Sequence, residues 1–221
     1  MPRESRAERK KRAQRIARAL QRAYPDAKCA LDFESPFQLL VATILSAQCT
    51  DEMVNKVTAE LFAEHASPQA LADAEPGEIE RLVRRTGFFR QKARSIQSAS
   101  RDIAEKFGGE VPRTLEDLLT LRGVARKTAN LVLGTAFGVP GLAVDTHMKR
   151  VNQRLCLTSE DDPVKIERDL MELIRRDEWT GYTHRVIQHG RECCDARRPR
   201  CEDCPLRSHC PHPGSARRQA G

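Results

Sequence analysis

The segment Leu121-Arg122-Gly123-Val124-Ala125-Arg126-Lys127-Thr128 decides how this chain is interpreted. Apolar residues at helical spacing precede and follow it, so residues 115–137 are predicted to form a helix, a short hairpin turn and a second helix. Gly123 permits a backbone geometry that other residues resist. The amides after it open the second helix, where the helix dipole favours an anion such as a DNA phosphate. From this segment alone, an ordinary turn between two helices remains the alternative.

Two residues near this turn are candidates for catalysis. Lys127 lies in the first turn of the second helix, where the positive helix end and Arg126 both disfavour another cation, so its amine is a candidate nucleophile. Asp145 follows an apolar stretch, residues 139–144, and is expected to cap the next helix. A carboxylate facing Lys127 across a groove would also stabilise positive charge growing on a sugar ring. A lysine that only contacts phosphate remains the alternative.

Four of the eight cysteines are spaced Cys-x6-Cys-x2-Cys-x5-Cys near the C-terminus, and they are Cys194, Cys201, Cys204 and Cys210. With no export signal in view, a metal or cluster site is favoured over a disulfide framework. Four thiolates in a compact loop can complete a zinc site or a [4Fe–4S] cluster. One Cys-x2-Cys pair with unequal flanks favours the cluster, although spacing leaves zinc open. Cys193 is spare.

The chain has 221 residues, 39% hydrophobic and 31% charged, with a net charge of +7 and a pI of about 9.1. This balance favours a polyanionic partner, because binding phosphates releases counterions. No apolar run approaches the length that spans a bilayer, and residues 1–22 lack the apolar core of a secretory signal. We therefore expect a cytoplasmic protein without a membrane partner.

Helical periodicity dominates the sequence, and no convincing alternating strand occurs, so the predicted fold class is all-α. Ser35 is the expected N-cap of a helix that starts at Pro36, with Gln38 completing a capping box. Further helices are predicted over residues 76–85, 93–107, 115–119 and 125–137, and another begins at residue 163. The tail over residues 211–221 is rich in Pro, Gly, Ser and Arg and is expected to be disordered.

Together these motifs resemble the endonuclease III family, the bifunctional DNA glycosylases of the helix-hairpin-helix superfamily. The resemblance runs from about Arg12 to Cys210. It rests on residues 45–51 (LSAQCTD), 126–130 (RKTAN), 143–147 (AVDTH) and 189–191 (HGR), and on the cysteine spacing. It implies a six-helix domain over residues 29–139 that carries the hairpin at about 115–137. Residues 1–28 and 140–221 would form an iron–sulfur cluster domain, with a DNA groove between the two.

The resemblance also implies residue roles. Lys127 matches the family's nucleophile, Asp145 its catalytic aspartate, and the four spaced cysteines its [4Fe–4S] ligands. Gln48 matches the residue that fills the gap left by a flipped nucleotide, and Phe88 falls at the position of a wedge into the opposite strand. The expected DNA contacts are Gln48, Phe88, Arg122, Gly123, Val124, Ala125, Arg126, Thr128, His147 and Arg191.

The implied activity is base excision repair. The enzyme would remove oxidised pyrimidines from duplex DNA and cleave the strand by β-elimination at the resulting abasic site, through a Schiff base on Lys127. Three rival functions remain. One is a glycosylase specific for adenine, thymine or uracil mismatches, and another is a non-catalytic DNA-binding iron–sulfur protein. The third is a redox carrier. The lysine favours the lyase, because the mismatch families lack it at this position.

Three positions depart from the family pattern, which usually has Leu-Pro-Gly-Val-Gly in the hairpin. Arg122 replaces the proline and adds a cation beside the phosphate. Ala125 replaces the second glycine and is expected to strain a glycine-type conformation, at a cost of about 1 kcal/mol. Phe88 replaces a leucine and, being bulkier, is expected to change lesion preference or opposite-base selectivity rather than abolish activity.

Overall fold

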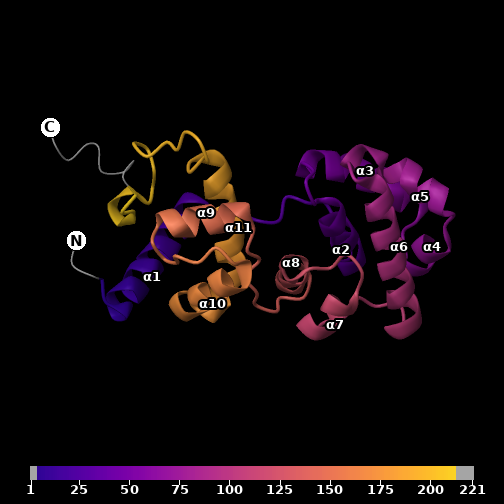
Figure 1. The fold of residues 1–221 in the computed structure, drawn as a ribbon, viewed down its shortest axis with the longest axis horizontal. Coiled ribbons are helices and arrows are strands. Elements are labelled where there is room, and N and C mark those ends of the chain that lie inside the picture. Colours follow the sequence, from indigo (N-terminus) through magenta and orange to yellow (C-terminus); the bar gives the residue numbers. More distant parts are fainter. Residues whose placement is uncertain (1–3, 213–221) are drawn as a thin grey trace. The chain divides into compact units, whose positions relative to one another are not determined.

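A computed structural model describes residues 4–212, and within that range the chain is helical with no strand, which confirms the predicted all-α fold (Figure 1). The chain divides into two compact units. Residues 29–139 form the central unit, and the two chain ends, residues 1–28 and 140–221, form the terminal unit. Within residues 4–212, no helix has both the length and the apolar character needed to cross a membrane. Of the tail expected to be disordered, residues 213–221 lie outside the described range.

The central unit contains seven α-helices and one 3-10 helix. They are α2 (Pro36–Leu45), α3 (Asp51–Glu64), α4 (Pro68–Asp73), α5 (Pro76–Val83), η1 (Arg84–Thr86), α6 (Phe89–Lys106), α7 (Leu115–Thr120) and α8 (Arg126–Ala136). The family resemblance implied a six-helix domain in this region. The structure has one more because Ser67 and Pro68 start the short α4, in which the Ser67 side chain accepts a hydrogen bond from the Ala70 amide at 3.1 Å.

The start of α2 shows how local sequence sets a helix end. The Ser35 hydroxyl accepts a hydrogen bond from the Gln38 amide at 3.2 Å, as the sequence predicted. The reciprocal bond differs from the expected capping box, because the Gln38 side chain accepts from the Glu34 amide at 2.7 Å, one residue before the N-cap. Both bonds still satisfy amides that the helix itself leaves unpaired.

α2 is the buried centre of this unit. Every residue from Phe37 to Leu45 is buried except Gln38, and the helix packs against α3, α6 and α8. Burying each large apolar side chain stabilises a fold by roughly 1.5–3 kcal/mol, so a helix that is apolar all round belongs in a core. The loop that follows α2 therefore begins at a buried helix.

The terminal unit contains α1 (Arg6–Ala23), α9 (Thr146–Arg154), α10 (Pro163–Leu173), η2 (Arg176–Glu178), α11 (Trp179–Glu192) and η3 (Arg207–His209). Its core includes Ile16 and Leu20 of α1 and Tyr182 of α11. The Tyr182 hydroxyl donates to Asn152 Oδ1 at 2.6 Å, so this fully buried phenol is satisfied. Burial raises the pKa of Tyr182 above its usual value, which keeps the phenol protonated.

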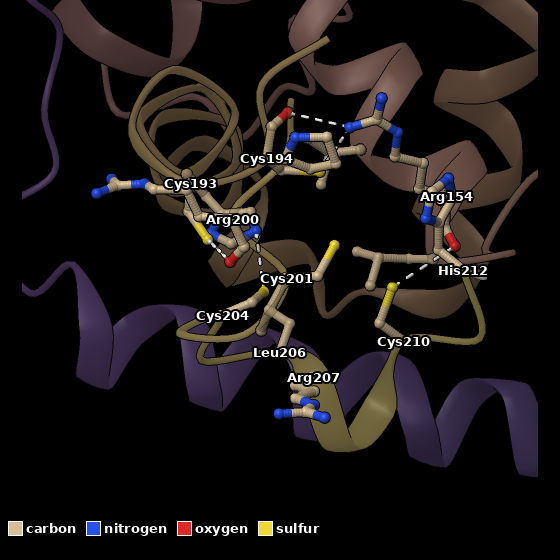
Figure 2. Close-up of a pocket in the computed structure, with 14 residues that line it drawn as sticks. Arg154, Cys193, Cys194, Arg200, Cys201, Cys204, Leu206, Arg207, Cys210 and His212 are labelled. Atoms are coloured by element: carbon tan, nitrogen blue, oxygen red, sulfur yellow. Dashed lines mark hydrogen bonds between the residues drawn. The ribbon is translucent and has the colours of Figure 1, made fainter. Parts of the chain in front are cut away.

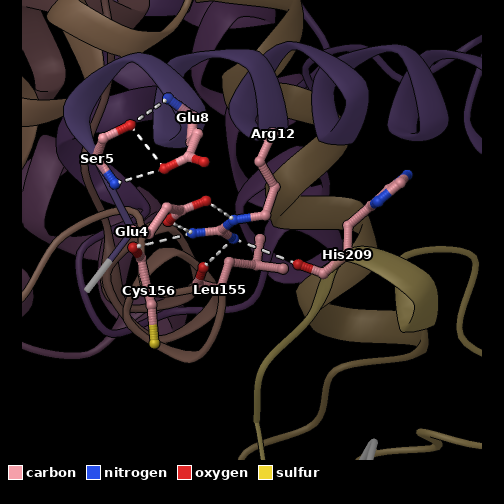
Figure 3. Close-up of polar contacts among 7 residues, drawn as sticks. All are labelled: Glu4, Ser5, Glu8, Arg12, Leu155, Cys156 and His209. Atoms are coloured by element: carbon pink, nitrogen blue, oxygen red, sulfur yellow. Dashed lines mark hydrogen bonds and ion pairs between the residues drawn. The ribbon is translucent and has the colours of Figure 1, made fainter. Parts of the chain in front are cut away.

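Arg12 joins the first helix to distant parts of the terminal unit (Figure 3). Its guanidinium donates to the carbonyl oxygens of Leu155 at 2.6 Å and His209 at 3.3 Å. It also forms a bidentate ion pair with Glu4, with both N–O distances at 2.8 Å. These contacts attach α1 to the end of α9 and to the segment that carries the last cysteine.

Candidate functional site

The turn between α7 and α8 requires a glycine at one position. Gly123 has φ 83°, in the left-handed region, and a Cβ added there would lie 2.8 Å from Ser95 Cβ. For both reasons, any residue larger than glycine would be strained at position 123. Ala125 has φ −93° and ψ 168°, an extended conformation that any residue adopts. The expected strain at Ala125 is therefore wrong, because only Gly123 occupies glycine-type backbone space in this turn.

Lys127 is the second residue of α8 and its side chain is exposed, as are Arg122 and Gly123 in the turn before it. Arg126 is half-buried, whereas Val124 and Thr128 are buried and anchor the turn. The turn thus combines the N-terminus of a helix with an exposed lysine beside it. This arrangement can bind an anion and present an amine next to it.

Asp145 precedes α9 in the terminal unit, where it is half-buried. Its Oδ1 accepts a hydrogen bond from the Met148 amide at 2.7 Å, which confirms the predicted N-cap. A carboxylate held in this way has a fixed orientation at the start of the helix.

His147 and Arg150, both on α9, form a polar group against the end of α11. An Arg150 Nη2 lies 3.0 Å from His147 Nδ1 and donates to the Gly190 carbonyl at 2.9 Å. Burial lowers the pKa of His147, which suits a neutral ring that accepts from the guanidinium. Gly190 is needed here because an added Cβ would lie 2.9 Å from His147 Nδ1. Arg191 follows at the surface, exposed.

Gln48 and Phe88 lie together in the central unit although 40 residues apart in sequence, because both line one pocket with Gly123. Ile44, Ala47, Gln91, Lys92 and Ser95 complete the lining. Phe88 is 65% exposed, so a large aromatic side chain stands in solvent at the edge of this pocket. The sequence prediction missed Lys92. Its position on the apolar stripe of α6, four residues before buried Ile96, was the available signal.

The cysteines near the C-terminus surround a second pocket, within the terminal unit (Figure 2). Its lining includes all four cysteines predicted as ligands, together with Cys193. Burial raises the pKa of Cys204 to about 12 and raises that of Cys210. Buried thiolates therefore require a compensating cation, which a metal cluster supplies. The donor set fits an iron–sulfur cluster.

Arg154, at the end of α9, holds the first of these cysteines. Its guanidinium donates to Cys194 Sγ at 3.2 Å, to the Asp195 carbonyl at 2.6 Å and to the Ala196 carbonyl at 2.8 Å. The sequence prediction missed this residue, since nothing local to Arg154 indicates a partner 40 residues away. Hydrogen bonds to cluster sulfurs are among the features by which proteins adjust a cluster.

Cys193 is buried and has partners of its own. Its thiol donates to the Arg200 carbonyl at 3.5 Å, and its Sγ lies within 4.8 Å of ligand atoms of His189 and Cys204. The His189 ring also lies 3.0 Å from the Tyr24 hydroxyl through Nδ1. Among the predicted ligands, this group contains Cys204 alone. Cys193 thus packs beside the cysteine pocket in a hydrogen-bonded position.

Comparison with known protein families supports this interpretation of the fold and site. Residues 41–176 match the HhH-GPD superfamily of base excision DNA repair proteins. Residues 194–210, which run from the first to the last predicted ligand, match the iron–sulfur binding domain of endonuclease III. Fold and cysteine loop together define a base excision DNA glycosylase with an iron–sulfur domain.

Individual relatives narrow the assignment. Endonuclease III of Synechocystis sp. is 55% identical over 206 residues, covering 93% of this chain and 94% of the relative. Endonuclease III of Bacillus subtilis is 44% identical over 188 residues, covering 85% and 86%. A solved non-covalent endonuclease III–DNA complex matches with a TM-score of 0.88 at 43% identity, covering 91% of this chain and 95% of that chain.

The chain belongs to the endonuclease III family. It is a bifunctional enzyme, a DNA glycosylase with AP lyase activity, and a [4Fe–4S] cluster is its cofactor. A thermostable thymine-DNA glycosylase has a TM-score of 0.83 at 22% identity, a likeness of fold alone. The mismatch glycosylase, the non-catalytic DNA-binding protein and the redox carrier are therefore not favoured.

Proposed function

We propose that this enzyme removes oxidised pyrimidines from duplex DNA and cleaves the strand through a Schiff base on Lys127. The observation that carries the proposal is the exposed lysine in the first turn of α8, directly after the Gly123 turn. A phosphate bound by the turn amides would bring the neighbouring sugar within reach of that amine. Family membership supplies the reaction class, and the lysine specifies the covalent route.

The proposed chemistry has three steps. The damaged nucleotide leaves the base stack, at a cost of a few kcal/mol. The uncharged Lys127 amine then attacks C1′ of the sugar, the C1′–N bond breaks, and the base departs with the bonding electron pair and a proton. The C1′–O4′ bond then breaks, O4′ takes the bonding electron pair and a proton, and the Lys127 nitrogen forms an iminium with C1′. This iminium acidifies the C2′ hydrogen, so loss of that proton and β-elimination expel the 3′ phosphate and nick the strand. We assign to Asp145 the stabilisation of positive charge on the sugar and the movement of protons.

DNA is the partner, and we propose that the central and terminal units each contribute contacts to it. The exposed Arg122 and the turn amides would hold the backbone without base recognition. Gln48 would fill the gap left by the flipped nucleotide and Phe88 would insert on the opposite side, and the exposure of Phe88 supports this role. We expect His147 and Arg191 to contact DNA from the terminal unit. A monomer in the cytoplasm, associated with the nucleoid, suits this activity.

The cluster ligands are proposed to be Cys194, Cys201, Cys204 and Cys210. All four line one pocket, and the matched iron–sulfur segment begins at the first and ends at the last. Cys193 lies just outside that segment. The cluster supplies four metal–thiolate links that fix the loop, and the loop's arginines at 197, 198, 200 and 207 would then face the DNA backbone.

Borohydride trapping on duplex DNA with one thymine glycol tests this function. Reduction of a Schiff base leaves a stable covalent protein–DNA adduct, which the wild-type enzyme is expected to form. Lys127→Ala should lose the adduct and lower the rate of strand nicking on the order of a thousandfold or more, because the nucleophile is gone. The readout is the shifted band on a denaturing gel.

Lys106→Ala is the matched control, because Lys106 is an exposed lysine that pairs only with Asp102 on the same helix. This variant should trap DNA as the wild type does. Full strand nicking by Lys127→Ala would show that another group is the nucleophile. Release of the base without an adduct in the wild type would instead indicate a monofunctional enzyme.

A further inference from the structure

A buried lysine lies beneath the pocket that holds Gln48 and Phe88. Lys92 of α6 is 5% exposed, and its Nζ donates hydrogen bonds to the carbonyl oxygens of Leu45 at 2.8 Å and Thr86 at 2.7 Å. Burial lowers the pKa of Lys92. A buried ammonium is costly unless its donors are satisfied, so its presence at a core position needs a structural reason.

Each of the two carbonyl groups that Lys92 binds belongs to the last residue of a helix. Leu45 is the last residue of α2, and Thr86 is the last residue of η1. Each ends a helical segment shortly before one of the two pocket residues, Gln48 or Phe88. The carbonyl end of a helix carries partial negative charge, so an ammonium is favoured there. The Lys92 ammonium therefore binds the carbonyl end of α2 and the carbonyl end of η1 at once.

Both residues that follow these segments have an unusual backbone. Gln48 has φ 53° and Phe88 has φ 47°, in the left-handed region that disfavours side chains larger than glycine. Within residues 4–212, Cys156 is the one other non-glycine residue with positive φ. Such conformations are strained and persist where the surroundings hold them.

The surroundings of Phe88 include little packing of its own side chain, which stands in solvent. Phe88 is the N-cap residue of α6, and its carbonyl accepts a hydrogen bond from the Lys92 amide at 3.1 Å. Lys92 thus makes two hydrogen bonds to the segment around Phe88, one from its backbone amide to the Phe88 carbonyl and one from its ammonium to the Thr86 carbonyl. It reaches the Gln48 segment through the ammonium alone.

We propose that Lys92 is a positioning residue that ties the two loops together, so that Gln48 and Phe88 are presented to DNA as a preformed pair. This inference rests on the proposed function of those two residues as DNA contacts. An ammonium suits the task because its three donors can serve two carbonyls at once. A side chain of the same length without donors would leave both carbonyls unpaired and would uncouple the loops.

Lys92→Met tests the inference by removing the donors while retaining an unbranched apolar stem. Single-turnover excision of thymine glycol from fully paired duplex should fall about tenfold, and excision of the same lesion from an unpaired bubble should change less than about twofold. A bubble does not require the pair, because the lesion is already unstacked. A residue with a merely structural role would slow both substrates equally.

Coupling between variants gives a second readout. In a Gln48→Ala/Phe88→Ala background, Lys92→Met should add less than about twofold, since its effect acts through those two side chains. Lys106→Met is the matched control, the same change on the same helix at an exposed position, and should stay within about twofold of the wild type.

The outcomes separate the two proposals. If Gln48→Ala and Phe88→Ala leave excision from paired DNA intact, their proposed role as DNA contacts fails and the inference about Lys92 fails with it. Suppose instead that Gln48→Ala and Phe88→Ala slow excision. If Lys92→Met then lowers the rate by its full factor in the double-alanine background, or slows excision from the bubble as much as from paired DNA, only the inference about Lys92 is wrong.

A variant with a weaker perturbation covers the case in which Lys92→Met does not fold. Lys92→Gln keeps amide donors on a shorter stem and cannot reach both carbonyls. Amide hydrogen exchange of this variant should rise together at residues 46–49 and 87–89 relative to the wild type. A rise in neither loop, or in one loop alone, would overturn the coupling.

Discussion

The central and terminal units fix their functional loops by different means. In the central unit, which is one continuous segment, the turn after α7 bends through the positive-φ residue Gly123. The loops after α2 and η1 combine positive-φ residues at 48 and 87–88 with hydrogen bonds from the buried Lys92 to the ends of the two helices. In the terminal unit, built from the two chain ends, the loop between α11 and η3 is attached by side chains from other elements. Arg150 and Arg154 on α9 donate to the backbone of residues 190–196.

This difference has a consequence for stability. A turn fixed by backbone conformation depends on a few residues close in sequence, so a single substitution acts locally. A loop fixed by guanidinium donors and thiolate ligands depends on partners far away in the chain, and its carbonyls are unpaired when one partner is lost. Perturbing the cysteine loop should therefore disturb the terminal unit and leave the central unit folded.

Removing one proposed cluster ligand should have the largest effect. Cys201→Ala is expected to abolish the visible absorbance of the cluster and to lower the free energy of opening of residues 194–210 by about 4 kcal/mol or more, because cluster binding contributes to folding. Amide hydrogen exchange measures this region by region. Protection of α2 and α8 should persist, which would show that the central unit stays folded without the cysteine loop.

Cys156→Ser is the control for that experiment, since Cys156 is an exposed cysteine in the same unit that does not line the cysteine pocket. It should keep both the absorbance and the protection pattern. Equal loss of protection in the two units of Cys201→Ala would contradict the comparison, because the central unit would then depend on the loop.

Replacing the guanidinium on the cysteine loop should have the next largest effect. Arg154→Met removes the donors to Cys194 Sγ and to two carbonyls of the loop, and we expect the terminal unit to lose about 3 kcal/mol, at the scale of charged hydrogen bonds. Urea unfolding followed through cluster absorbance measures the loss. Arg168→Met, at an exposed position on α10, should change it by less than about 0.5 kcal/mol.

Sequence patterns predicted well those features that local residues determine. Ser35 caps its helix as expected, and the helices predicted to begin at residues 115 and 163 begin there, capped by Thr114 and Asp162, because N-caps act within three residues. Asp145 likewise caps α9. The all-α fold and the hairpin glycine follow from periodicity and from backbone geometry at one position.

Features that depend on distant partners were missed. Lys92 and Arg154 matter through carbonyls brought to them by the fold, and no local pattern indicates those contacts. The conformation of Ala125 was predicted incorrectly for a related reason. A family glycine suggests special backbone geometry, whereas Ala125 here has an ordinary extended conformation, with φ −93°, directly after a turn that the Val124 amide closes by donating to the Leu121 carbonyl at 3.1 Å.

A substitution at the hairpin glycine should act within the central unit alone. Gly123→Ala places a methyl group 2.8 Å from Ser95 Cβ and forces a side chain to adopt φ 83°, so we expect a loss of about 2 kcal/mol. Urea unfolding of the central unit measures it. Gly77→Ala is the matched control, because a Cβ there meets nothing within 4 Å, and it should cause no comparable loss.

The smallest expected effect distinguishes two explanations of the turn. Ala125 has φ −93°, so Ala125→Gly relieves no strain and instead adds freedom to the unfolded chain, which should lower stability by about 0.4–1 kcal/mol. A strained alanine would give the opposite sign, since glycine would then stabilise the fold. The urea midpoint of this variant, measured beside Gly123→Ala, therefore decides whether positive φ alone, rather than the family's glycine pattern, determines where this turn needs glycine.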